Sequence, residues 1–146
     1  LVVGDLRIIH QSLEYMGLMD MEHDYLEALS VGHQQRAFIA MVIAQDTDYI
    51  LLDEPLNNLD MKHSVQIMKM LRRLVDELGK TVVIVLHDIN FASVYSDRIV
   101  ALKEGRVVRD GPTNDIINSD SLREIYDMEI PIKQMSNCRI CVYFNS

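Results

Sequence analysis

The chain has 146 residues, of which 49% are hydrophobic and 25% are charged, and its formal net charge is −8. This composition is typical of one globular domain with a core of ordinary size, and it argues against a disordered or fibrous chain. The 14 basic residues are scattered along the chain. That placement argues against nucleic acid as a partner, because phosphate binding depends on clustered Lys and Arg.

The apolar runs, such as residues 82–86, are far shorter than the roughly 20 residues of a membrane-spanning helix. We therefore expect any link to a membrane to come through a partner protein. Cys138 and Cys141 lie in a stretch that alternates like a strand, which puts them on opposite faces. We expect two unpaired thiols in a reducing compartment rather than a redox pair.

Helical patterns dominate the first part of the chain. Asp5 can cap a helix that Gly17 ends, and residues 21–27 indicate a short second helix. Ser30 fits the N-cap of a third helix, and the dense apolar residues between 34 and 45 predict that most of this helix is buried.

Two continuous apolar runs follow, at residues 49–52 and 82–86, separated by a helical segment at 61–78 that Gly79 closes. Strands that are apolar on both faces, joined by a helix, predict a βαβ unit in a parallel sheet covered by helices. The remaining elements are expected in the order helix, hairpin, helical segment and hairpin, at residues 88–95, 99–109, 111–127 and 129–144.

Two acidic residues follow the first apolar run. Asp53 ends a parallel strand, the edge at which open α/β sheets hold ligands, and its carboxylate can bind Mg²⁺ beside substrate phosphates. Glu54 is one residue further along a chain expected to be extended, so it points to the other face and is a candidate general base for an attacking water. By itself such a pair is more often a solvated turn or a helix cap; the apolar run before it and the histidine after the next strand favour a site.

Three further positions complete the pattern. Residues 30–32 begin a helix, so backbone N–H groups and the positive end of the helix dipole face outward, as an anion site requires. His87 follows the second apolar run and is expected at the same sheet edge as Asp53, although an isolated histidine is usually structural or solvated. Asp60 precedes the helix at 61–78 and can serve as its N-cap.

In this order and at this spacing the segments resemble the second half of the ATPase of an ABC transporter. Residues 29–36 resemble its signature motif, residues 49–55 its Walker B strand and residues 57–60 its D-loop. His87 resembles its switch histidine. The resemblance covers nearly the whole chain, since residues 96–112 look like the segments that follow the switch histidine in this family.

The resemblance implies an α/β fold of the P-loop NTPase class, with ATP and Mg²⁺ as cofactors and two subunits in a head-to-tail dimer. It implies that Asp53 holds the metal ion and that Glu54 and His87 are catalytic. The residues that it implies in nucleotide binding across the dimer are Ser30, Val31, Gly32, His33 and Asp60. Val31 and His33 stand where the family has glycine and glutamine, whereas the retained Gly32 would let the backbone approach a phosphate closely.

The phosphate loop G-x-x-x-x-G-K-[ST] does not occur in the sequence, which begins at Leu1. We therefore expect an incomplete ATPase fold, with residues 1–46 in the helical subdomain and residues 47–146 forming the C-terminal half of the core and a terminal hairpin. ATPase activity is expected of the full-length protein and little of the isolated chain.

Residues 86–92 and 139–143 look most like importers of iron chelates. This likeness predicts an ATP-hydrolysing subunit that drives import of iron–siderophore complexes through a membrane permease, from the cytoplasmic face of the cell membrane. Two alternatives stay open. One is a soluble ABC-type ATPase without a permease, acting in translation or DNA repair, and the other is a non-hydrolysing interaction module of the same fold.

Overall fold

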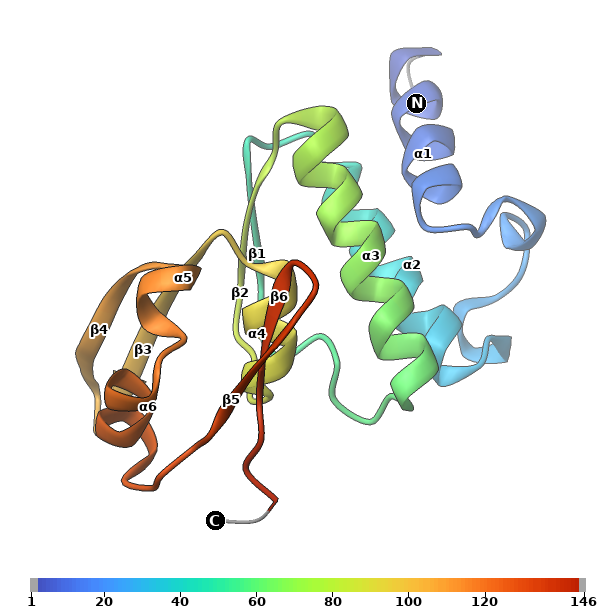
Figure 1. Ribbon diagram of the computed structural model, residues 1–146. Helices are drawn as coiled ribbons and strands as arrows, with labels where there is room; N and C mark the ends of the chain where they lie inside the picture. The colour runs from blue at the N-terminus through green and yellow to red at the C-terminus, as the bar shows by residue number, and fades with distance from the viewer. Residues whose placement is uncertain (1–2, 145–146) are drawn as a thin grey trace. The chain divides into compact units, whose positions relative to one another are not determined.

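A computed structural model describes residues 3–144 (Figure 1). The chain forms two compact units, Leu1–Val85 and Leu86–Ser146. This division reflects compactness, and the functional boundary expected near residue 46 stays a prediction. Within the described residues, no helix is long and apolar enough to cross a membrane.

The first unit is built on a βαβ crossover, as expected. The expected cover of helices over the whole sheet is wrong for the described residues, since one face is exposed, with Leu51 at 71% and Val83 at 52%. Strand β1 pairs with β2 in parallel, in a register that runs from Tyr49 opposite Thr81 to Leu52 opposite Ile84. The elements of this unit are α1 (Val3–Tyr15), η1 (Met19–Met21), η2 (Leu26–Ala28), α2 (Val31–Ile43), β1 (Tyr49–Leu52), α3 (Met61–Leu78) and β2 (Thr81–Ile84).

The short second helix expected at residues 21–27 is wrong. Two single-turn 3₁₀ helices, η1 and η2, stand in its place, and neither contains a buried residue. A helix this short gains too few backbone hydrogen bonds to offset its nucleation, and here no buried face supports one.

Helix α3 has the ends that the sequence predicts. Asp60 caps its N-terminus by accepting the backbone N–H of His63, and Gly79 closes it with a left-handed φ of 64°, a conformation that favours glycine. Its apolar residues Val65 and Val75 are only half-buried. The buried residues are Ser64, Ile67, Met68, Leu71 and Leu74.

Helix α2 lies beside α3 (Figure 1), with their N-terminal turns in contact. Ser30 caps it, as expected. The expectation of a mostly buried helix is wrong on one face, where Phe38 is 50% and Met41 60% exposed. The buried face consists of Gly32, Ile39, Ala40 and Ile43.

The second unit has its own apolar core. Its elements are α4 (Ile89–Tyr95), β3 (Arg98–Lys103), β4 (Arg106–Pro112), α5 (Thr113–Ile116), α6 (Ser119–Tyr126), β5 (Ile132–Met135) and β6 (Cys138–Cys141). Strands β3 and β4 form one antiparallel hairpin, and β5 and β6 form the expected terminal hairpin. The core residues are Ile89, Ile117, Leu122, Ile130 and Cys141.

The expectation of unpaired thiols is confirmed, since Cys138 and Cys141 are both free. Cys141 is buried in the second core, and this burial raises the pKa of its thiol. A thiol that resists ionisation is a poor nucleophile. Cys141 is therefore a packing residue.

Leu74 tests the core of the first unit, because its side chain is fully buried in α3. We expect Leu74→Ala to lower the free energy of unfolding by about 2–5 kcal/mol, through lost burial and the cavity left behind. Met61 is 67% exposed in the same helix, so Met61→Ala should change stability by less than about 0.5 kcal/mol. Urea unfolding followed by circular dichroism measures both, and equal losses would contradict the assigned core.

Candidate functional site

Asp53 and Glu54 follow β1 directly, where the chain leaves the sheet. Asp53 is exposed and Glu54 is half-buried. Glu54 has a left-handed φ of 48°, so the extended backbone expected at this residue is wrong. For a residue other than glycine, this backbone conformation costs about 1–3 kcal/mol of free energy. Residues strained in this way cluster at functional sites.

The turn after Glu54 is held by Asn57. The side-chain amide of Asn57 donates to a carboxylate oxygen of Glu54, and its backbone N–H donates to the Glu54 carbonyl oxygen at 3.2 Å. Asn58 follows, also with a left-handed φ, of 62°. The loop therefore fixes both the backbone and the carboxylate of Glu54 close to the end of β1.

Asp53 offers one hard oxygen ligand for a cation. Among residues 3–144, no group of three or more His, Cys, Asp or Glu side chains is placed to hold a metal ion. Mg²⁺ keeps several waters and takes one or two carboxylates together with substrate phosphates. Asp53 thus fits a magnesium ion that arrives with a phosphate ligand, and does not form a metal site by itself.

The first turn of α2 carries Ser30 and His33. The Ser30 hydroxyl accepts the backbone N–H of His33 at 3.4 Å, and it lies 2.7 Å from Nδ1 of the His33 ring. Burial lowers the pKa of His33, and the nearby Arg36 and His63 lower it further. These effects favour the neutral form of the His33 ring. Val31 points outward at the same turn and is 59% exposed.

Gly32 is buried against a side chain from α3. A Cβ atom at Gly32 would lie 2.8 Å from Cδ2 and 3.1 Å from Cγ of His63, closer than nonbonded carbon atoms approach. Close approach to a phosphate was the expected reason for Gly32. The structure adds a second reason for this glycine, since the His63 ring occupies the space beside it.

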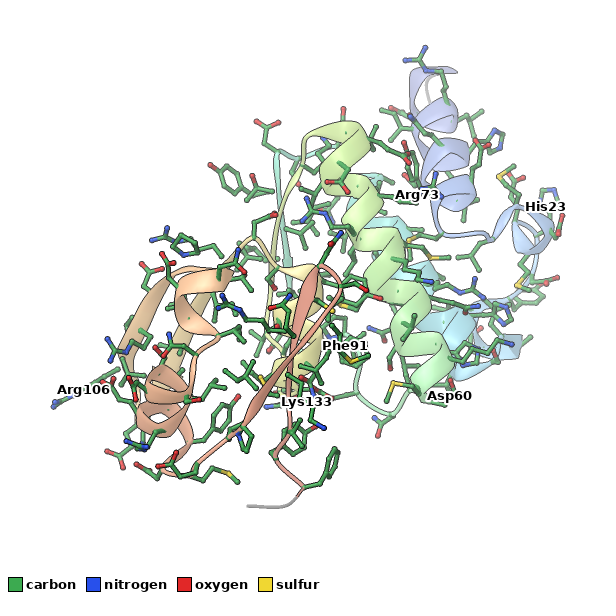
Figure 2. All side chains as sticks on the ribbon, viewed as in Figure 1. His23, Asp60, Arg73, Phe91, Arg106 and Lys133 are labelled. Carbon is green, nitrogen blue, oxygen red and sulfur yellow. The ribbon has the colours of Figure 1, made fainter. Side chains whose placement is uncertain are left out.

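Asp60 links this contact to the loop that begins at Asp53. Its carboxylate accepts the backbone N–H of His63 at 2.9 Å and lies 2.8 Å from Nδ1 of the same residue. These contacts, led by the backbone hydrogen bond, lower the pKa of Asp60. Figure 2 shows Asp60 at the start of α3, close to the first turn of α2. His63 stands three residues after the N-cap, where a capping box has Glu or Gln, and that spacing was the signal in the sequence.

His87 lies in the second unit, immediately before the N-cap of α4. The carboxylate of Asp88 accepts the backbone N–H of Asn90 at 2.7 Å, which confirms Asp88 as the cap. His87 is exposed. Its expected grouping with Asp53 and Glu54 stays a prediction, because the two units are separate bodies.

The helix that follows His87 is fastened to the last strand. The side chain of Asn90 accepts the backbone N–H of Cys141 at 2.7 Å and donates to the Cys141 carbonyl oxygen at 3.2 Å. The Ser93 hydroxyl donates to the Arg139 carbonyl oxygen at 2.6 Å. The terminal hairpin therefore fixes α4, and with it the segment that carries His87.

Known proteins resemble both the sequence and this arrangement. The family model described as ABC transporter matches residues 5–57. The petrobactin import ATP-binding protein YclP of Bacillus subtilis is 69% identical over 137 residues, which is 94% of this chain and 54% of that protein. The chain is thus similar to the ABC transporter family along most of its length.

Two other proteins of this family extend the comparison. The iron(3+)-hydroxamate import ATP-binding protein FhuC of Bacillus subtilis is 38% identical over 97% of this chain and 53% of its own length. The structure of CbiO1 from Clostridium perfringens, part of the ABC transporter complex CbiONQ, matches with a TM-score of 0.74 and 30% identity, over 85% of this chain and 50% of that one. The expected ABC ATPase fold is thus confirmed, and the chain spans about half the length of the curated relatives it matches.

Asn90 gives a test of how α4 is held. We expect Asn90→Ala to lower the free energy of unfolding by about 1–3 kcal/mol, because the buried N–H and carbonyl groups of Cys141 lose their partners. Asn114 is exposed, and Asn114→Ala is the matched control with little expected effect. Chemical unfolding measures both variants, and an unchanged Asn90→Ala would show that the hairpin does not depend on this contact.

Proposed function

We propose that this chain is part of the ATP-hydrolysing subunit of an importer for iron–siderophore complexes. The observation that carries the proposal is 69% identity to a petrobactin import ATP-binding protein over 94% of the chain. The likeness to an iron(3+)-hydroxamate import protein supports the same class of cargo. Both relatives are import proteins, which favours transport over a soluble ATPase or a non-hydrolysing module.

Glu54 is the proposed general base. It follows the strand that ends at Asp53, and Asn57 holds its carboxylate, so it is oriented before substrate arrives. In the reaction Glu54 would accept a proton from the water that attacks the terminal phosphate of ATP. His87 would contact that phosphate and orient the water.

Asp53 would bind Mg²⁺ together with the phosphates of ATP, and the ion would supply neutralisation of phosphate charge. The first turn of α2, from Ser30 through Val31 and Gly32 to His33, would direct its backbone N–H groups at the nucleotide of a second subunit. Asp60 would lie at the contact between the two nucleotide sites. This role is compatible with its observed function as the cap of α3.

The proposed assembly is a head-to-tail dimer of two such subunits bound to a membrane-spanning permease. The subunits would lie at the cytoplasmic face of the cell membrane, with residues 1–46 in the helical subdomain that contacts the permease. Closure of the dimer around ATP and Mg²⁺ and reopening after hydrolysis would drive transport.

Glu54→Gln in the full-length protein tests the assigned base. The amide keeps the shape of the side chain but cannot take up a proton, so we expect kcat for ATP hydrolysis to fall by about 100-fold or more while ATP binding persists. Glu104 lies in the exposed turn between β3 and β4, and Glu104→Gln should keep normal turnover. Steady-state hydrolysis retained in Glu54→Gln would move the base to another residue.

Ser30→Arg tests whether the start of α2 acts on another subunit. A bulky, positively charged side chain there should block closure of the dimer, while ATP binding to each full-length monomer stays within about threefold of the wild type. Ser119 begins α6 and is exposed, so Ser119→Arg is the control for added charge. Equilibrium binding of ATP and sedimentation of the ATP-bound protein read out the two effects. A collapse of monomer affinity would assign Ser30 to the site of its own subunit.

A further inference from the structure

His63 contacts both the first turn of α2 and the end of the loop that follows β1. Its ring packs against Gly32 in the first turn of α2, and its Nδ1 lies 2.8 Å from the Asp60 carboxylate at the end of the loop from β1. We propose that His63 is a positioning residue that locks the start of α2 to the loop carrying Glu54 and Asp60. This inference rests on the proposed function, because it assigns His63 to the ATPase site.

The chemistry of the pair sets the orientation of the ring. An ionised carboxylate only accepts hydrogen bonds, so Nδ1 of His63 carries the ring proton and donates a hydrogen bond to Asp60. The same carboxylate oxygen accepts the backbone N–H of His63 at 2.9 Å. Side chain and backbone are therefore held by one acceptor, and the ring of His63 is fixed relative to the first turn of α3.

The ring of His63, held in this orientation, contacts α2 at Gly32. A Cβ atom at Gly32 would meet Cδ2, Cγ and Nε2 of His63 at 2.8, 3.1 and 3.2 Å. The edge of the ring formed by these atoms thus occupies the place of a side chain at position 32. In the same turn, the Ser30 hydroxyl lies 2.7 Å from Nδ1 of His33, so the contact at Gly32 acts on a turn that has its own internal hydrogen bond.

A mechanical consequence follows for the ATPase. Any displacement of Asp60 moves the His63 ring, and the ring can move toward α2 only if the turn at Gly32 moves as well, because atoms in contact cannot interpenetrate. The N-terminal turn of α2 and the loop from Glu54 to Asp60 therefore shift together within one subunit. His63 acts on the reaction through these neighbours.

A double-mutant cycle in the full-length protein tests the contact. We expect Gly32→Ala to lower kcat roughly ten- to hundredfold, because the new methyl group displaces the ring and the turn. Gly32→Ala combined with His63→Ala should restore kcat to the level of His63→Ala alone. An equal loss from Gly32→Ala in both backgrounds would overturn the proposal and leave close approach to a phosphate as the sole reason for this glycine.

Conservative variants separate the hydrogen bond from the volume of the ring. His63→Asn places an amide donor where Nδ1 lies and should keep kcat within about threefold of the wild type, whereas His63→Leu fills the space without a donor and should lose about tenfold. KM for ATP should be unchanged in both, and their thermal unfolding reports any general loss of stability. Equal kcat in His63→Asn and His63→Leu would overturn the role of the Asp60 contact.

A second measurement does not depend on hydrolysis. Asp60→Asn should shift the backbone amide resonances of residues 30–33 in the wild-type background and leave them unchanged in His63→Ala. The same shifts in both backgrounds would overturn the proposal. A wild-type protein that hydrolyses no ATP would count against the proposed function, and the amide shifts would still decide whether His63 joins the two segments.

Discussion

The parallel pairing of β1 with β2 is the constraint on which the first unit depends. The ladder begins where Thr81 donates to the Asp48 carbonyl oxygen and ends where Val85 donates to that of Leu52, each at 2.9 Å. Two parallel strands need a long crossover, and α3 fills that role. The pairing therefore fixes where β1 ends, where Asp53 and Glu54 leave the sheet, and how the loop reaches α3.

The crossover helix α3 also fixes the far end of the loop that carries Asp53 and Glu54. Asp60 ends the loop and begins α3, and His63 one turn later reaches α2. The carboxylate that caps α3 also contacts the ring of the histidine. The strain at Glu54, with its φ of 48°, is therefore held between two rigid ends, a sheet and a capped helix.

Local rules predicted much of this fold. Ser30, Asp60 and Asp88 are caps because their side chains accept N–H groups two or three residues away, and such patterns can be read from neighbouring letters. The parallel strands follow from their continuous apolar runs. The positions of Asp53 and Glu54 at the end of β1 follow from the same pattern.

Contacts between distant residues could not be predicted in this way. His63 meets Gly32 across an intervening strand, and Asn90 meets Cys141 over a separation of 51 residues; neither pair has a local signature. The left-handed backbone conformation of Glu54 could not be predicted either, because glutamate has no preference for it. The turn needs Asn57 and the sheet together to hold that conformation.

The fastening of β6 to α4 has a consequence for solubility. A two-stranded hairpin exposes an outer edge whose unpaired backbone groups can recruit strands from other molecules. In β6 the outward groups of Cys141 are both taken by the side chain of Asn90, and the outward carbonyl of Arg139 is taken by Ser93. Polar side chains of a helix thus occupy three of the backbone positions that an incoming strand would use, which opposes intermolecular sheet growth and aggregation at this edge.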